Sequence, residues 1–137
     1  MTKKIKLNII GIFIIFNAMS CSTSISKPLG EWDDIIKLSQ KEATLSAENS
    51  SILITTQGEW WWISSIDFDG TQIDFGDIDT TQNNFIIEKP EFKIERINKT
   101  EIHIEISKNT TDSVRVLYIG LEAGDYFDSI KITQLSD

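Results

Sequence analysis

The sequence predicts an all-β domain, an antiparallel β-sandwich of about seven to nine short strands. Ile is the most frequent apolar residue, and β-branched side chains favour sheet over helix. Short apolar runs alternate with turn residues along the chain, and no segment carries an apolar stripe at helical spacing. A small barrel is the alternative that this pattern leaves open.

The first 20 residues are typical of a secretory signal peptide. Lys3, Lys4 and Lys6 form a basic start, and residues 7–16 form an apolar run. That run is shorter than the roughly 20 apolar residues that span a bilayer. We therefore predict a cleaved signal peptide at residues 1–20.

The segment Ala18-Met19-Ser20-Cys21 resembles a lipobox, the site at which lipoprotein signal peptidase cuts before a lipidated cysteine. The resemblance implies acyl chains on Cys21, which would anchor the chain stably in a membrane. An ordinary secretory peptide with an incidental cysteine is the alternative. Residues 21–34 are then the lipidated cysteine and a short polar tether, and residues 35–137 are the domain.

Charge and cysteine content exclude several classes of protein. Without residues 1–20 the chain keeps 10 basic and 21 acidic residues, a net charge of about −11. Such a surface repels nucleic acid and anionic headgroups, so we expect no nucleic-acid partner. The single cysteine excludes an internal disulfide. Ser22 and Thr23 differ from the Asp that retains some lipoproteins at the inner membrane, which favours the outer membrane.

Turn residues divide the first half of the domain into strands. Asn49-Ser50 and Gln57-Gly58 bound one β-branched run. Asp69-Gly70 between two apolar runs is a strong hairpin signal, because both turn positions need positive φ. The strands predicted here are Ile35–Leu38, continuing over 43–47 after a kink, Ser51–Thr56, Trp60–Phe68 and Thr71–Phe75.

The second half has the cleanest alternation in the chain. Ile102, Ile104 and Ile106 share one face of a predicted strand, and the residues between them are polar, so this strand is half-buried. Val114–Leu121 is apolar on both faces, which predicts a central strand. The strands predicted here are Asn84–Glu88, Phe92–Ile97, Glu101–Ile106, Val114–Leu121 and Ile130–Leu135, with turns at 89–90, 98–100 and 123–125.

Several of these segments resemble BACON domains, the Bacteroidetes-associated carbohydrate-binding, often N-terminal group. The resembling features are residues 54–58 running into Trp60-Trp61-Trp62-Ile63, Arg115 opening a strand, and the closing residues 130–134. The resemblance covers residues 36–135 and implies an immunoglobulin-like sandwich on a secreted or surface protein. It also implies carbohydrate or mucin binding, although many members serve as spacers. The chain departs from the pattern in lacking a catalytic module and in an insert over residues 69–84.

Tryptophans are the strongest candidates for ligand contacts, since an exposed indole stacks on a sugar ring. In a regular strand Trp60 and Trp62 point one way and Trp61 the other, so at least one belongs to the core. We expect Trp60, Trp61 and Trp32 to be the candidate ligand-binding residues. Trp32 also lies beside the tether, which it could dock on the domain or hold near the membrane.

Acidic residues crowd the predicted hairpin and suggest calcium only weakly. Asp67, Asp69 and Asp74 supply hard oxygen ligands, but Gly70 falls too early for the helical calcium loop and no Glu closes the site. A solvated hairpin is the preferred interpretation. We expect no cofactor and a fold that needs no metal.

Nothing in the sequence assembles a catalytic site. His103, the only histidine, lies between Glu101 and Glu105 on the polar face of a strand, with no nucleophile beside it. No pair of carboxylates stands out for glycoside hydrolysis. We therefore predict a protein that is not an enzyme. A small hydrolase accessory is a third interpretation, after the two given below.

Three tripeptides resemble the Asp-Ser/Thr sites that some Bacteroidetes glycosylate on exported proteins. Their candidate acceptors are Thr80, Ser113 and Ser129. The favoured function is weak glycan or mucin binding by an envelope lipoprotein that is held to the membrane through Cys21. The alternative is a structural or assembly subunit that binds a partner envelope protein through its sheet edges or an apolar patch.

Overall fold

Nine β-strands and no helix make up residues 30–137, which are the part of the chain that the computed structural model describes. The predicted signal peptide and Cys21 lie outside the described residues. Trp32–Asp137 form one compact unit. The strands are β1 (Glu42–Leu45), β2 (Ser50–Thr55), β3 (Trp62–Phe68), β4 (Thr71–Gln72), β5 (Phe85–Glu88), β6 (Phe92–Ile97), β7 (Glu101–Ile106), β8 (Arg115–Ala123) and β9 (Tyr126–Gln134).

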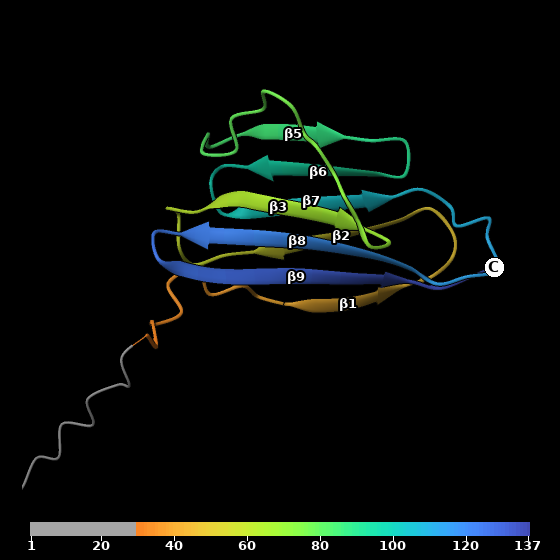
Figure 1. The fold of residues 1–137 in the computed structure, drawn as a ribbon, viewed down its shortest axis with the longest axis horizontal. Coiled ribbons are helices and arrows are strands. Elements are labelled where there is room, and N and C mark those ends of the chain that lie inside the picture. Colours follow the sequence, from red (N-terminus) through yellow and green to blue (C-terminus); the bar gives the residue numbers. More distant parts are fainter. Residues whose placement is uncertain (1–29) are drawn as a thin grey trace, which may run out of the picture. The chain divides into compact units, whose positions relative to one another are not determined.

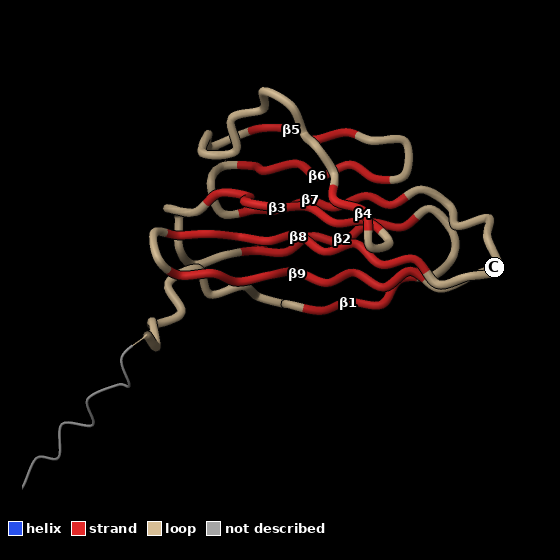
Figure 2. Tube along the Cα trace, in the orientation of Figure 1, coloured by secondary structure: helices blue, strands red, loops and turns tan. Residues whose placement is uncertain are grey.

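The strands form two sheets that pack face to face. One sheet has five strands in the order β1-β9-β8-β3-β4, and the other has four in the order β2-β7-β6-β5. Figure 1 shows β5 and β1 on opposite sides of the sandwich. Figure 2 shows that loops close both ends of the strands. The expected sandwich is confirmed, and two separate sheets replace the barrel alternative.

Branched aliphatic side chains from both sheets fill the space between them. The predicted half-buried strand is β7, where Ile102, Ile104 and Ile106 are buried and the residues between them are partly exposed. Across the sandwich, the rings of Phe68 and Phe92 lie 5.6 Å apart. Burial of these apolar surfaces is the main stabilising contribution, because the chain has no internal disulfide.

The predicted Asp69-Gly70 turn is confirmed. Both residues have positive φ, 50° and 78°, as a tight hairpin between twisted strands requires. The turn is also tied to the neighbouring strand, because the backbone N–H of Val116 donates to Asp69 Oδ1 at 2.7 Å. Asn98 and Lys99 likewise adopt positive φ in the predicted turn between β6 and β7.

The expectation of a first strand at Ile35–Leu38 is wrong. Ile36 is fully buried there, but positive φ at Lys37 interrupts the extended backbone, and Leu38 makes only an isolated bridge to Thr56. The first strand is β1, within the stretch that was predicted as a continuation. It pairs in parallel with β9, which follows it by more than 80 residues, so β1 joins the sheet only through this distant contact.

Two other predicted strands are shorter than expected. The strand predicted from Trp60 begins at Trp62, where pairing with β8 starts, because the carbonyls of Glu59 and Trp61 bond Arg96 rather than a neighbouring strand. The return strand predicted to reach Phe75 ends at Gln72. The chain then turns at Gly76, where φ is 64° and the N–H donates to Asp74 Oδ1 at 2.8 Å.

The prediction that Val114–Leu121 forms a central strand is confirmed by β8, which pairs with β9 on one side and β3 on the other. Its outer face, however, is open to solvent. Tyr118, which points away from the core, is 42% exposed. A strand can therefore be central in its sheet while one apolar face remains uncovered.

Candidate functional site

The three candidate tryptophans have very different surroundings. Trp61 is only 2% exposed, and its Nε1 donates to Thr56 Oγ1 and the Gly58 carbonyl, both at 3.1 Å. It is therefore a core residue and cannot contact a ligand in this structure. Trp60 is 87% exposed and Trp32 is 59% exposed, so these two indoles are accessible.

A buried arginine holds the segment that carries Trp60 and Trp61. The guanidinium of Arg96 donates to the carbonyls of Glu59 and Trp61, each at 2.8 Å, and to that of Gln82 at 3.1 Å. Its guanidinium carbon lies 3.7 Å from the centroid of the Trp61 ring. Burial lowers the pKa of Arg96 to about 10. Arg96 thus fixes the residues on both sides of Trp60.

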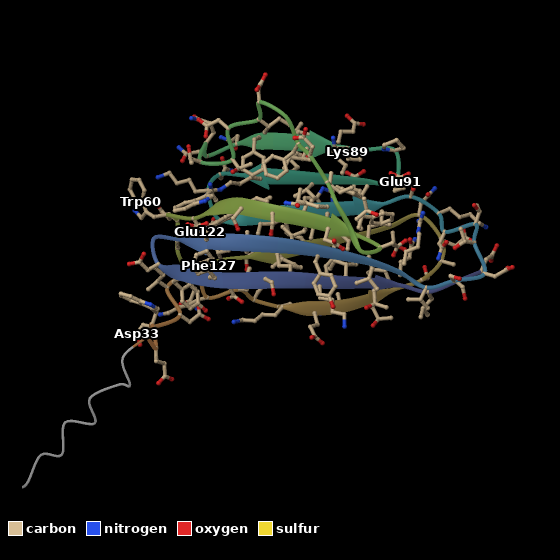
Figure 3. All side chains as sticks on the ribbon, viewed as in Figure 1. Asp33, Trp60, Lys89, Glu91, Glu122 and Phe127 are labelled. Atoms are coloured by element: carbon tan, nitrogen blue, oxygen red, sulfur yellow. The ribbon has the colours of Figure 1, made fainter. Side chains whose placement is uncertain are left out.

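An aromatic row crosses the outer face of the five-stranded sheet. Trp62 on β3 is paired with Glu122 on β8, which is paired with Phe127 on β9. Side chains that are paired in this way lie about 5 Å apart at Cβ, so Glu122 sits directly between the two rings. Phe127 is 65% exposed. Figure 3 shows Trp60, Glu122 and Phe127 toward the same end of the sandwich.

The next row on this face contains only small residues. Ser65 is paired with Gly120, and Gly120 with Ser129. A side chain at Gly120 would meet the neighbouring strand, because its Cβ would lie 2.3 Å from Ser65 Oγ. The bulge between Ile63 and Ser65 adds the exposed hydroxyl of Ser64 to this row. These small residues, Ser64, Ser65, Gly120 and Ser129, form a polar strip across the sheet that lies below the level of the neighbouring aromatic side chains.

A third row borders the strip on its other side. Tyr118 on β8 is paired with Asp67 on β3 and Lys131 on β9, and Lys131 Nζ lies 5.7 Å from the centroid of the Tyr118 ring. Successive rows on one face of a sheet are about 7 Å apart. The strip therefore has aromatic side chains on both long sides and hydroxyls along its floor.

The aspartates suggested as calcium ligands act instead as acceptors in turns. Asp67 Oδ1 accepts from the Gly70 N–H at 2.9 Å, and Asp74 Oδ1 accepts from Gly76. Asp69 Oδ1 is bound by the Val116 N–H as described above. Within residues 30–137, no three His, Cys, Asp or Glu side chains come together as a metal site.

The candidate glycosylation acceptors differ in accessibility. Thr80 is 7% exposed, and its hydroxyl donates to the Ile63 carbonyl at 2.8 Å, so a transferase could not reach it in this fold. Its burial follows from the loop that carries it across the edge of the sandwich. Ser113 and Ser129 are exposed.

A hollow of about 530 Å³ lies on the outer face of the four-stranded sheet and contains the histidine. Lys93 Nζ lies 3.1 Å from Glu105 Oε1 and 3.7 Å from Glu95, and the hydrogen bond with Glu105 raises the pKa of Lys93. His103 Nδ1 lies 3.5 Å from the same Glu105 oxygen. The charges at this hollow thus form a solvated ion-pair cluster with no nucleophile activated by a base.

The edge of β2 carries unpaired backbone groups. At the C-terminal end of β2 the backbone of Thr55 faces away from the sheet. Its carbonyl accepts from the Ser39 N–H at 2.8 Å, and its own N–H donates to Ser39 Oγ at 2.9 Å. Because alternate residues of a strand face the same edge, Leu53 and Ser51 also direct their backbone groups outward. Leu53 is 53% exposed, so an apolar side chain accompanies this open edge.

Comparison with known proteins supports the fold alone. No model of a known protein family matches the chain, and no curated protein matches it either. A protein from Bacteroides thetaiotaomicron solved by NMR is similar in structure, with a TM-score of 0.62 and 22% identity, over 82% of this chain and 96% of that one. Titin domain M7 aligns over 74% of this chain and 95% of its own, with a TM-score of 0.42 and 14% identity. The β-sandwich expected from the sequence is confirmed by the two sheets themselves.

The register of the five-stranded sheet brings together aromatic residues that were not predicted from the sequence. Trp62, Phe127 and Tyr118 come from three different strands, and none was among the candidate contacts. The turn at 123–125 could have indicated that Glu122 faces Phe127, since it sets the register of the hairpin.

No helix of residues 30–137 is long and apolar enough to cross a membrane.

Proposed function

We propose that this chain is a non-enzymatic, lipid-anchored envelope protein that binds glycans weakly on the outer face of its five-stranded sheet. One observation carries the proposal. Trp62, Phe127 and Tyr118 border a strip of small residues, which are Ser65, Gly120 and Ser129.

The chemistry of this strip suits a sugar. The apolar C–H face of a pyranose stacks on the negative face of an aromatic ring, which Phe127 and Trp62 offer from one side and Tyr118 from the other. Serine hydroxyls can both donate and accept, so they match the hydroxyl groups of a sugar. The strip is open rather than enclosed, so little ligand surface is buried and the affinity is expected to be low.

The membrane anchor is a separate part of the proposal. The lipobox-like sequence supports lipidation of Cys21, and the residues that follow it favour the outer membrane. The resemblance to BACON domains supports a surface-exposed carbohydrate-binding role. Labelling cells with a fatty-acid analogue should mark the wild-type chain and leave a Cys21→Ser variant unmarked; label on the variant would contradict the assignment.

A second candidate function is binding of a partner envelope protein along the open edge of β2. The observation that favours it is the outward-facing backbone of Ser51 and Leu53. A partner strand could add to the sheet there through main-chain hydrogen bonds. Glycan binding is preferred because, among the described strands, the five-stranded sheet is the one whose outer face brings aromatic side chains and hydroxyls together.

The test is a glycan-panel binding measurement on the full chain, purified in detergent, beside four single variants. Phe127→Ala and Tyr118→Ala remove one border of the strip each, and we expect each to weaken binding about fivefold or more. Trp60→Ala asks whether the exposed indole at the same end extends the platform. Leu53→Ala is the matched control, because Leu53 is similarly exposed but lies on the other sheet.

The outcomes separate the two candidates. Binding that is lost in folded Phe127→Ala and kept in Leu53→Ala supports the strip. Absence of binding across neutral and acidic glycans of plant and host origin would refute the glycan proposal. An envelope protein that crosslinks to the wild type and is lost in Leu53→Ala would then favour the edge of β2.

A further inference from the structure

We infer that the strip selects uncharged glycans and rejects acidic ones, because Glu122 lies between Trp62 and Phe127 and makes no ion pair with a Lys or Arg of residues 30–137. This inference rests on the proposed function and adds the class of ligand. It concerns the same face of the five-stranded sheet, and it follows from how charges are arranged there.

Glu122 is the charged centre of the aromatic row. The register places it opposite Trp62 on one side and Phe127 on the other, and its side chain is partly exposed. Among the described residues no Lys or Arg makes an ion pair with it; the ion pairs of this part of the chain involve other acids. Figure 3 shows its side chain near that of Phe127, at the end of the sandwich.

The remaining charges on this face are also mainly negative. Asp67 is paired with Tyr118 on the far side of the strip, and Glu42 is paired with Lys131. Lys131 is the one basic residue that the register of the described strands places on this face; its Nζ lies 5.7 Å from the centroid of the Tyr118 ring, and Glu42 is its neighbour across the strand pair. A ligand in the strip therefore meets a net negative field.

This field acts differently on neutral and acidic sugars. A carboxylate accepts hydrogen bonds from sugar hydroxyls, and such charge-assisted bonds are about twice as strong as neutral ones. A uronic or sialic acid brings a second carboxylate. Two like charges about 4 Å apart cost about 1 kcal/mol in bulk water, which is about fivefold in affinity, and more where water is excluded.

The experiment compares ligands that differ in one charge. The full chain in detergent is titrated with a neutral galactose oligomer and with the matching galacturonate oligomer, in which C6 is a carboxylate. We expect the neutral oligomer to bind at least fivefold more tightly at low salt. Raising the ionic strength should narrow the difference, because salt screens exposed charges.

Two variants locate the effect. Glu122→Gln keeps the size and hydrogen-bonding capacity of the side chain and removes its charge, so the acidic oligomer should gain affinity by about fivefold. Glu88→Gln is the matched control: Glu88 is an exposed acid on β5 of the other sheet, so it should leave the ratio unchanged.

The inference and the proposed function fail in different ways. Equal or tighter binding of the galacturonate oligomer to the wild type would overturn the inference while leaving glycan binding in place. An unchanged ratio in folded Glu122→Gln would also overturn it. If no neutral or acidic oligosaccharide in a wider panel binds, the proposed function fails, and the inference fails with it. The salt titration needs no variant, so it tests the inference even if Glu122→Gln does not fold.

Discussion

The guanidinium of Arg96 stacks on the indole of Trp61, with the guanidinium carbon 3.7 Å from the ring centroid, inside a sandwich whose other buried side chains are mainly apolar. No carboxylate neutralises this cation among the hydrogen bonds of the described residues. Backbone carbonyls from three separate segments accept its N–H groups instead. One side chain therefore joins the turn after β6 to the loop before β3 and to the loop between β4 and β5.

Replacing Arg96 should be among the most destabilising single changes in the domain. Arg96→Met keeps much of the volume but leaves the carbonyls of Glu59, Trp61 and Gln82 buried or poorly solvated, so we expect a loss of about 3 kcal/mol or more. Urea unfolding followed by tryptophan fluorescence measures it. Lys99→Met is the control, because the ion pair of Lys99 with Glu59 is exposed and contributes about 0.5 kcal/mol. Equal losses in the two variants would contradict the role given to Arg96.

The Asp69-Gly70 turn predicts opposite results for two substitutions at one position. Gly70 has φ of 78°, which a β-branched residue adopts only with strain, so Gly70→Val should cost about 1–2 kcal/mol. Gly70→Asn is the matched control, because Asn tolerates positive φ, and it should cost much less. Midpoints of denaturant unfolding decide between them. Similar midpoints for both variants would show that the turn conformation is not what limits stability.

The close approach of Gly120 to Ser65 predicts a coupled pair. Gly120→Ala places a Cβ 2.3 Å from Ser65 Oγ, and the adjustment should cost about 1–2 kcal/mol. Adding Ser65→Ala removes the hydroxyl and should restore most of that stability, so the two changes are not additive. Ser129→Ala, in the same row, should have an effect below about 0.5 kcal/mol. A double variant whose loss equals the sum of the single losses would disprove the contact.

We expect the Tyr126 hydroxyl to lose its proton at a higher pH than a free tyrosine does, so that the stability of the fold decreases in alkali. Burial, together with the nearby Asp128 carboxylate, raises the pKa of Tyr126 to about 12. The unfolded chain loses this proton near pH 10, so between about pH 10 and 12 the folded state holds more protons and stability falls as the pH rises. In Tyr118→Phe, Tyr126 is the sole remaining tyrosine of the chain's two, and its phenolate absorbance reports the titration. A midpoint near 10 would contradict the burial.

Local sequence patterns were sufficient to predict much of the fold. The alternation of Ile102, Ile104 and Ile106 predicted which face of β7 is buried, because side chains of a strand alternate whatever it packs against. The Asp69-Gly70 pair predicted its turn, since positive φ is a property of the residues themselves. In contrast, the parallel pairing of β1 with β9 escaped prediction, because it joins segments far apart in the sequence.

The sequence by itself determined that this chain forms an all-β sandwich, because strand periodicity and turn chemistry depend on neighbouring residues. It also narrowed the candidate contacts to aromatic side chains. Only the tertiary structure decided which aromatics are free: Arg96, distant in sequence, covers Trp61, while sheet register leaves Phe127 and Tyr118 open on either side of Gly120. Burial and register arise from contacts between strands far apart in the chain, so no local pattern could assign them.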